Sequence, residues 1–284
     1  MVTLKDYENG ETAWCPGCGN FGILQAVKKA LVKVGLEPYQ VLMVSGIGQA
    51  AKLPHYMKCN FFNGLHGRTL PVATGAKIVN PKLKVIAVGG DGDGYSEGGN
   101  HFIHAIRRNI DVTYLVHDNQ IYGLTKGQAS ATSDEGFVTK TTPLGAFSKP
   151  LNPIALAISQ GISFVGRGFS GDIEHLSTLI SEAIENRGFS LVDILQPCVT
   201  FNRVNTYQWY RKRVYKIDNS YDPKDKNSAF QKAQEWGERI PIGKIYTQDR
   251  MTYLEHDPEI ENKPVIEQKH DLENFQNILE DFKI

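Results

Sequence analysis

Short apolar segments alternate with segments of helical periodicity over the first 200 residues, and this alternation constrains the fold more than any other feature. Such an order is typical of βαβ units and a parallel sheet. The predicted strands are residues 40–44, 84–88, 112–116, 162–165 and 191–195. The predicted helices are residues 22–34, 70–78, 100–108, 154–159 and 173–184. We therefore expect an α/β fold with a mostly parallel sheet and helices on both faces.

The character of the chain changes after about residue 200. Residues 200–250 are rich in Tyr, Arg, Lys and Asn and show no alternation, and the acidic end finishes in a predicted amphipathic helix at 272–282. We expect an α/β domain over residues 1–200. Residues 201–284 then form a C-terminal extension that packs on this domain and on a partner subunit.

Charge and hydropathy exclude several classes of protein. Among 284 residues, 31 Lys and Arg balance 31 Asp and Glu, so an excess of positive charge for binding nucleic acid is absent. The N-terminus lacks the basic and apolar regions of a secretory signal, and no apolar run approaches a membrane span. These features favour a cytoplasmic protein without a membrane or nucleic-acid partner.

Polar or glycine-rich residues follow four predicted strands. They are the segments 45–48, 89–100, 117–119 and 197–198. In open parallel sheets, ligands bind beyond the carboxyl ends of the strands. The second segment, GGDGDGYSEGGN, leaves a buried strand and places six glycines around two aspartates. The glycines allow close approach of the backbone to a ligand, and the carboxylates indicate a cation.

Three nucleotide or cation motifs do not match this segment. The spacing of its glycines fails the dinucleotide pattern G-x-G-x-x-G, and the chain contains no P-loop sequence. An EF-type calcium loop needs alternating carboxylates and a distal glutamate, which are also absent.

The remaining pattern is Gly90-Asp91-Gly92 followed, after 26 residues, by Asn119. It resembles the thiamine diphosphate motif, in which a GDG after one strand pairs with an asparagine after the next. Mg²⁺ prefers oxygen ligands, so Asp91 and Asn119 are its predicted protein ligands, and the resemblance implies the carbonyl of Ile121 as a third. Gly92 and Asp93 would offer backbone N–H groups to the diphosphate, aided by a helix beginning near Gly98.

A wider resemblance extends over most of the chain. The segments WCPGCGNFGIL, VSGIGQAAKLPH, GLHGRTLPVATG, GGDGDGYSEGGNHFIHAIRRN and DNQIYGLTKGQAS resemble the β subunit of 2-oxoacid:ferredoxin oxidoreductases. They cover residues 14–130 almost continuously, and the likeness continues to about residue 215. The resemblance implies a thiamine diphosphate-binding fold of the diphosphate-binding type with Mg²⁺ and one 4Fe–4S cluster. The implied activity is oxidative cleavage of a 2-oxoacid to acyl-coenzyme A and CO₂, with electrons passed to ferredoxin.

The cysteines depart from the family pattern. Many members have a cluster cysteine within SGIGCxGK, where this chain has Gln49. We therefore expect the chain's four cysteines, Cys15, Cys18, Cys59 and Cys198, to hold the cluster, with Cys59 replacing the missing ligand. Two alternatives remain open, namely a tetrahedral zinc site and a cluster held by three cysteines with Cys59 buried and inert.

The resemblance also implies roles for residues around the cofactor. His66 is expected beside the diphosphate, and Lys52 near the carboxylate or carbonyl of the substrate as a catalytic residue. The expected cofactor-lining residues are Ile47, Gly48, Gln49, Ala50, Gly123 and Leu124.

The chain has one sheet domain, and thiamine enzymes take an activating glutamate from a second, pyrimidine-binding domain. We therefore expect a partner subunit (α, or α plus γ) that supplies this glutamate. Ferredoxin, coenzyme A and a 2-oxoacid are the other implied partners, and the preferred acid stays open between pyruvate, 2-oxoglutarate and related acids. Two further functions are considered: a non-oxidative thiamine-dependent decarboxylase or synthase component, and a zinc-binding scaffold subunit.

Overall fold

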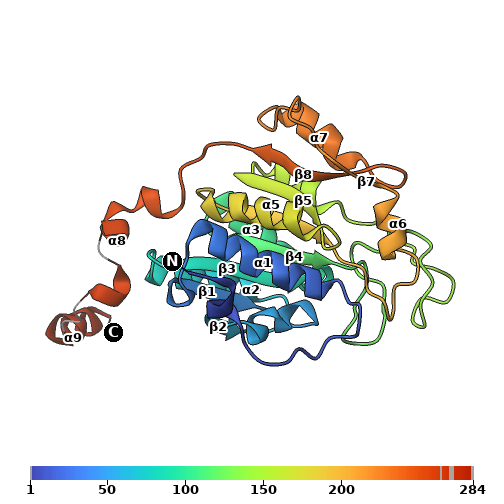
Figure 1. Ribbon diagram of the computed structural model, residues 1–284. Coiled ribbons are helices and arrows are strands. Elements are labelled where there is room, and N and C mark those ends of the chain that lie inside the picture. Colours follow the sequence, from blue (N-terminus) through green and yellow to red (C-terminus); the bar gives the residue numbers. More distant parts are fainter. Residues whose placement is uncertain (1, 263, 269–271, 283–284) are drawn as a thin grey trace.

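The computed structural model describes residues 2–262, 264–268 and 272–282. Within these ranges one sheet of eight strands has the order β2-β1-β3-β4-β6-β5-β8-β7 (Figure 1). The strands are β1 (Val41–Ser45), β2 (Asn60–Asn63), β3 (Lys84–Gly90), β4 (Thr113–Asp118), β5 (Phe164–Phe169), β6 (Ser190–Leu195), β7 (Val214–Lys216) and β8 (Ile240–Thr247). Strands β1 to β6 are parallel, and β8 pairs antiparallel to β5. The five predicted strands and the mostly parallel sheet are confirmed.

Helices cover both faces of the sheet, as predicted. One face carries α1 (Asn20–Val34) and α5 (Ile173–Glu185), which pack together in front of the strands in Figure 1. The other face carries α2 (Thr69–Val79), α3 (Gly99–Arg108), α4 (Pro153–Ser159) and α7 (Lys226–Gln234). The shorter elements are α6 (Tyr207–Arg211), α8 (Pro258–Asn262), η1 (Leu4–Tyr7), η2 (Pro38–Gln40), η3 (Ala50–Tyr56), η5 (Leu254–His256) and η6 (Val265–Glu267).

Local sequence explains the two helices on the first face. In α5 the residues Leu176, Leu179, Ile180 and Ala183 recur at helical spacing and are buried, while the Asp172 side chain caps the helix by accepting the His175 N–H at 3.2 Å. Helix α1 ends at Gly35, whose φ of 77° is the left-handed conformation that glycine adopts without strain. Because helices lie on both faces, the central strands are buried on both sides and mostly apolar rather than alternating, with Asp118, Arg167 and Asp193 as charged exceptions.

Part of the predicted C-terminal extension belongs to the main sheet. Strands β7 and β8 continue the sheet beyond β5. Neither strand was predicted, because residues 200–250 show no alternation of apolar and polar residues. Strand β2 was also missed, since all four of its residues are exposed at the sheet edge. The predicted terminal helix is confirmed as α9 (Leu272–Asp281), which lies with α8 away from the sheet in Figure 1. No helix in the described ranges is long and apolar enough to cross a membrane.

Candidate functional site

The loops after four neighbouring strands meet at the carboxyl edge of the sheet. Strands β1, β3, β4 and β6 are adjacent and parallel, and each is followed by a polar or glycine-rich segment. The register pairs Gly90 of β3 with His117 of β4, so Asp91 and Asn119 leave adjacent strand ends within one residue of each other. The fold therefore brings the two predicted metal ligands to the same edge.

Asp91 is a buried carboxylate held by hydroxyl groups. Its Oδ2 accepts hydrogen bonds from Ser130 Oγ and from Thr132 Oγ1, the latter at 2.7 Å. Burial raises the pKa of this carboxyl, and the groups that oppose the rise are hydroxyls and backbone N–H groups rather than a cationic side chain. A divalent cation would balance the buried charge, so Asp91 fits a Mg²⁺ ligand. Ser130 and Thr132 were not predicted, because they lie in a polar loop without a recognisable pattern.

Asn119 is fixed by contacts at both ends of its amide. Its Oδ1 accepts the Ile121 N–H at 3.0 Å, and its Nδ2 donates to Gln196 Oε1 at 3.1 Å. Gln120, between Asn119 and Ile121 in the chain, has a φ of 57°, so the backbone turns sharply at this point. The amide oxygen keeps a second acceptor site for a metal, and Ile121 is buried beside it.

The GDGDGYSE segment forms a π-helical turn, η4 (Gly92–Glu97), that leads into α3. Such turns are frequent at functional sites. A Cβ on Gly92 would lie 2.3 Å from the Tyr122 ring, and one on Gly94 would lie 2.2 Å from the Tyr114 hydroxyl oxygen. These glycines are therefore required for close packing of the turn against β4 and the loop that follows it.

The Asp93 carboxylate joins three loops, a role that the sequence did not predict. Its Oδ1 accepts hydrogen bonds from the Ile47 N–H at 3.0 Å and the Gly67 N–H at 2.9 Å. The same oxygen lies 2.7 Å from His66 Nδ1, which must be the donor because an ionised carboxylate only accepts. Its Oδ2 accepts from Thr69 Oγ1 at 3.1 Å. This network positions His66, whose side chain is 41% exposed, and the backbone of Ile47.

The remaining predicted cofactor residues lie on the loops around this network. Gly48 has a φ of 127° and follows the exposed Ile47, and Ala50 is buried at the start of η3. Lys52 is partly buried within η3. Gly123 lies beside Asn119 and Gln49, and Leu124 is exposed. No described contact assigns a role to Lys52 or Leu124, so their roles stay predictions.

Three of the four cysteines line one cavity of about 50 Å³. Cys15 and Cys18 form a turn in which the Cys18 N–H donates to the Cys15 carbonyl at 3.0 Å, and the Gly19 N–H ties this turn to the Pro197 carbonyl at 3.2 Å, next to Cys198. Burial raises the pKa of the Cys18 thiol to about 11. The other residues lining the cavity include Trp14, Gln49, Asn119, Gly123 and Gln196.

Cys59 lies apart from these three, contrary to the prediction that it completes their set. It precedes β2, whose Asn60 pairs with Leu42 near the amino end of β1, whereas the cavity lies beyond the carboxyl end. The side chain packs against the apolar cluster that contains Tyr7 and Met43. The sequence placed Cys59 near Gln49 in the chain, but a strand-length of backbone separates them across the sheet.

The described residues contain no group of three or more His, Cys, Asp or Glu side chains that converges as a single metal ion requires. Zinc needs its ligands around one ion at about 2.3 Å, and the cysteine group has no such arrangement. A four-iron cluster places each thiolate on a different iron, so a wider spacing around a cavity is compatible with it. The grouping of Cys15, Cys18 and Cys198 fits a cluster better than zinc.

One amide joins the two parts of the site. Gln196, which follows β6, accepts from Asn119 Nδ2 through its Oε1 and donates through its Nε2 to Cys18 Sγ at 3.5 Å. The predicted magnesium ligand and the predicted cluster ligand are therefore separated by a single side chain. Hydrogen bonds to cluster sulfurs also tune reduction potential. Gln196 was not predicted, because a single glutamine after a strand carries no distinctive signal.

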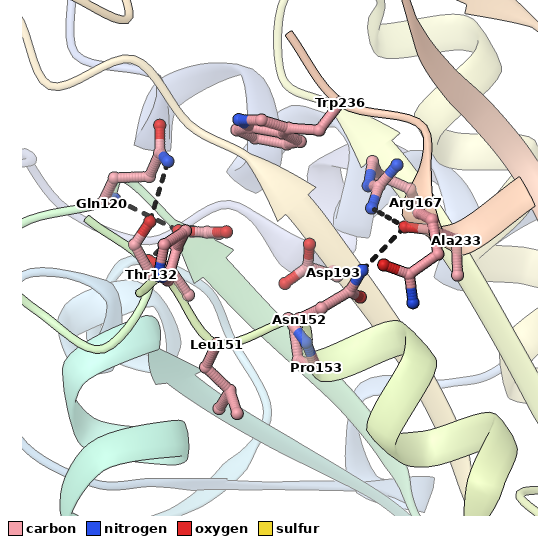
Figure 2. Close-up of a pocket in the computed structure, with 12 residues that line it drawn as sticks. Gln120, Thr132, Leu151, Asn152, Pro153, Arg167, Asp193, Ala233 and Trp236 are labelled. Atoms are coloured by element: carbon pink, nitrogen blue, oxygen red, sulfur yellow. Dashed lines mark hydrogen bonds between the residues drawn. The ribbon is translucent and has the colours of Figure 1, made fainter. Parts of the chain in front are cut away.

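A second, charged cavity of about 200 Å³ is lined in part by Gln120, which follows Asn119, and by Thr132 (Figure 2). Its wall includes Arg167 of β5, Asp193 of β6 and Asp118 of β4. The Arg167 guanidinium lies 5.6 Å from the ring of Trp236 and opposes the burial that raises the pKa of Asp193. Thr132 connects this cavity to the site, because its hydroxyl contacts both Asp91 and Asp118, the latter at 2.8 Å.

Comparison with known proteins agrees with this geometry. Residues 41–194 match the family model described as thiamine pyrophosphate enzyme, C-terminal TPP binding domain, and residues 198–262 match the C-terminal model of the pyruvate ferredoxin oxidoreductase beta subunit. The 2-oxoacid:ferredoxin oxidoreductase subunit beta of Saccharolobus solfataricus is 48% identical over 255 residues, which cover 85% of this chain and 84% of that one. The chain belongs to the β subunits of 2-oxoacid:ferredoxin oxidoreductases.

Other members of this enzyme family show the same relationship. The 2-oxoglutarate oxidoreductase subunit KorB of Mycobacterium tuberculosis is 45% identical over 70% of this chain and 53% of its own length. A solved structure, 2-oxoglutarate:ferredoxin oxidoreductase from Magnetococcus marinus with 2-oxoglutarate, coenzyme A and succinyl-CoA bound, aligns with a TM-score of 0.91 and 36% identity, covering 100% of this chain and 97% of that one. The thiamine diphosphate-binding fold predicted for this β subunit is thereby confirmed.

Proposed function

We propose that this β subunit and a partner together catalyse the coenzyme A-dependent oxidative decarboxylation of a 2-oxoacid, with 2-oxoglutarate the first candidate. Electrons would leave through a four-iron cluster to ferredoxin. The observation that carries the proposal is the bridge of Gln196 between Asn119 and Cys18. A cofactor tethered at Asn119 would lie next to the cluster cavity, which is the arrangement that electron exit requires.

The chain's own residues would hold and orient the reacting groups. Asp91, Asn119 and the carbonyl of Ile121 would bind Mg²⁺, while Gly92 and Asp93 would direct backbone N–H groups to the diphosphate. Thiamine diphosphate would supply the nucleophilic carbon and the electron sink for decarboxylation, and the cluster a one-electron acceptor. Ile47, Gly48, Gln49, Ala50, Gly123 and Leu124 would line the cofactor.

Two polar side chains would act near the substrate and the diphosphate. His66, held by Asp93, would direct its other ring nitrogen toward the diphosphate as a hydrogen-bond donor, because the diphosphate oxygens only accept. Lys52 would place an ammonium near the substrate carboxylate, which favours a 2-oxoacid over a simple ketone.

In this proposal the reaction is completed by the partner. The partner would supply the glutamate that activates the aminopyrimidine ring and the coenzyme A site. The naming of relatives as 2-oxoglutarate enzymes, and of the structural neighbour with 2-oxoglutarate and succinyl-CoA bound, supports 2-oxoglutarate as the substrate.

The test is reconstitution with the partner under anaerobic conditions. Reduction of ferredoxin or a viologen is measured with pyruvate, 2-oxoglutarate or a branched 2-oxoacid as the substrate, with coenzyme A present or omitted. We expect activity with coenzyme A, abolished by Asn119→Ala and retained by the exposed control Asn100→Ala. Decarboxylation without acceptor reduction would support the non-oxidative alternative, and full turnover by the isolated chain would contradict the need for a partner.

A further inference from the structure

The fourth corner of the proposed cluster lacks a thiolate in this fold. This inference rests on the proposed function, which places a four-iron cluster in the cavity of Cys15, Cys18 and Cys198. A cube of four irons takes four protein ligands, usually thiolates. The chain contains only one other cysteine, Cys59.

Cys59 is held where it cannot reach the cavity. It takes a hydrogen bond from the backbone of Met43, in the middle of β1, and its burial in the apolar cluster raises the pKa of the thiol to about 12. The cavity begins after Ser45, the last residue of β1, and strand residues advance about 3.3 Å each. A partly buried thiol with a raised pKa, packed among apolar side chains, is unreactive.

Gln49, on the loop after β1, is a wall residue of the cavity. It lines the cavity together with the three cysteines, and its backbone carbonyl accepts the Trp14 Nε1–H at 2.9 Å, which fixes the residue beside the Cys15 turn. Its side-chain Oε1 is buried and has no hydrogen-bond partner among the described residues. A buried acceptor without a hydrogen bond costs about 1–3 kcal/mol. A bound group that interacts with this oxygen would remove that cost.

We propose that three thiolates, from Cys15, Cys18 and Cys198, hold the cluster, and that its fourth iron faces Gln49 Oε1. An amide oxygen is a neutral, weaker ligand for iron than a thiolate. The fourth iron is therefore exchangeable, whereas the other three are fixed.

One-electron oxidation of the cluster would release the fourth iron and leave the other three in place. A four-iron cluster of charge 2+ then becomes a three-iron cluster of charge 1+, with release of one Fe²⁺ and one electron, so that iron and charge balance. Added ferricyanide accepts the electron. The intact four-iron cluster of charge 2+ is diamagnetic, and the three-iron product is paramagnetic, so EPR separates them.

The experiment uses the complex with the partner, purified anaerobically and titrated with ferricyanide. Released iron is measured with a chromophoric Fe²⁺ chelator, and the cluster by EPR. For the wild type we expect one iron released per cluster and a three-iron EPR signal, reversed by Fe²⁺ and dithionite. Gln49→Cys should suppress both iron release and signal at least tenfold, and Cys59→Ala should behave as the wild type.

Three results would overturn the inference. One is a wild-type cluster that keeps four irons under ferricyanide, with Gln49→Cys giving no change. Another is loss of the cluster in Cys59→Ala while Gln49→Ala keeps it intact. Under either of these two results the proposed function would stand, because the wild-type complex would still contain iron and sulfide. Wild-type complex that purifies anaerobically without iron and sulfide would overturn the inference and the oxidative function together.

Discussion

Replacement of Asp93 tests how the loops of the site are held. The carboxylate accepts hydrogen bonds from the N–H groups of Ile47 and Gly67, from His66 and from Thr69, at distances between 2.7 and 3.1 Å. Its side chain is 1% exposed, so water cannot replace it at these donors without rearrangement. Asp93→Ala leaves the N–H groups of Ile47 and Gly67 and the Thr69 hydroxyl without an acceptor, whereas the half-exposed His66 can bond to water.

The magnitude follows from these contacts. Each buried donor left unsatisfied costs about 1–3 kcal/mol, and relaxation reduces the sum, so Asp93→Ala should lower the free energy of unfolding by about 3–6 kcal/mol. Asp93→Asn keeps an acceptor oxygen toward Ile47, Gly67 and His66, loses the charge, and replaces the acceptor of the Thr69 hydroxyl by an NH2 group to which that hydroxyl can turn as acceptor. Its expected cost is about 1–2 kcal/mol, and that of Thr69→Val, which removes one bond, about 1 kcal/mol.

Urea unfolding of the purified protein, followed by circular dichroism, measures all three variants against the wild type. Thiamine diphosphate affinity, measured by calorimetry on the complex with Mg²⁺, should fall in the order wild type, Asp93→Asn, Asp93→Ala, because the Ile47 and Gly67 loops lose their common anchor. The reasoning is refuted if Asp93→Ala costs less than about 1 kcal/mol, or if Asp93→Asn is as damaging as Asp93→Ala.

Three further predictions concern neighbouring residues. Thr132→Val should weaken Mg²⁺ binding about tenfold by calorimetry, because the carboxylate of Asp91, the proposed Mg²⁺ ligand, loses one hydrogen bond worth roughly 1.5 kcal/mol. Thr132→Ser should not weaken it, and equal affinities of the two variants would contradict this prediction. Gly94→Ala should lower the free energy of unfolding by about 1–3 kcal/mol, because its Cβ would lie 2.2 Å from the Tyr114 hydroxyl oxygen, while the control Gly75→Ala, with open space around the Cβ, should cost nothing. Burial raises the pKa of Asp193 to about 6 in the folded protein, so the native state binds a proton that the unfolded state has released, and stability contributed by this group falls as pH rises from about 4 to about 6. Asp193→Asn should therefore flatten the pH dependence of urea unfolding in that window, and an unchanged profile would contradict the assignment.

The order of elements and the meeting of Asp91 and Asn119 at one sheet edge were readable from the sequence because both depend on local patterns. Apolar runs separated by helical periodicity determine where strands and helices form, and all five predicted strands occur in the sheet. A GDG after one strand and an asparagine after the next must lie close together once the strands are parallel neighbours, which the register of β3 and β4 satisfies. Capping by Asp172 and the helix end at Gly35 are likewise local signals.

Contacts between distant segments were decided only by the tertiary structure. Nothing in the chain near Asp93 indicates that its carboxylate anchors loops 26 and 46 residues away, and Gln196 meets Cys18 across 178 residues. Strands β7 and β8 extend the sheet beyond β5, although their own sequences show no alternation.

The cysteines show the same division. The sequence contains four cysteines, and Cys15 and Cys18 are neighbours because they lie in one short turn. Whether Cys59 or Gln49 faces them depends on the direction and register of β1 and β2, which place Cys59 at one end of the sheet and Gln49 at the other. The sequence determines which side chains are present, but the pairing of the strands decides which of them line the same cavity. Residues close in the chain can lie a strand length apart, whereas the carboxyl ends of neighbouring parallel strands lie at one edge of the sheet.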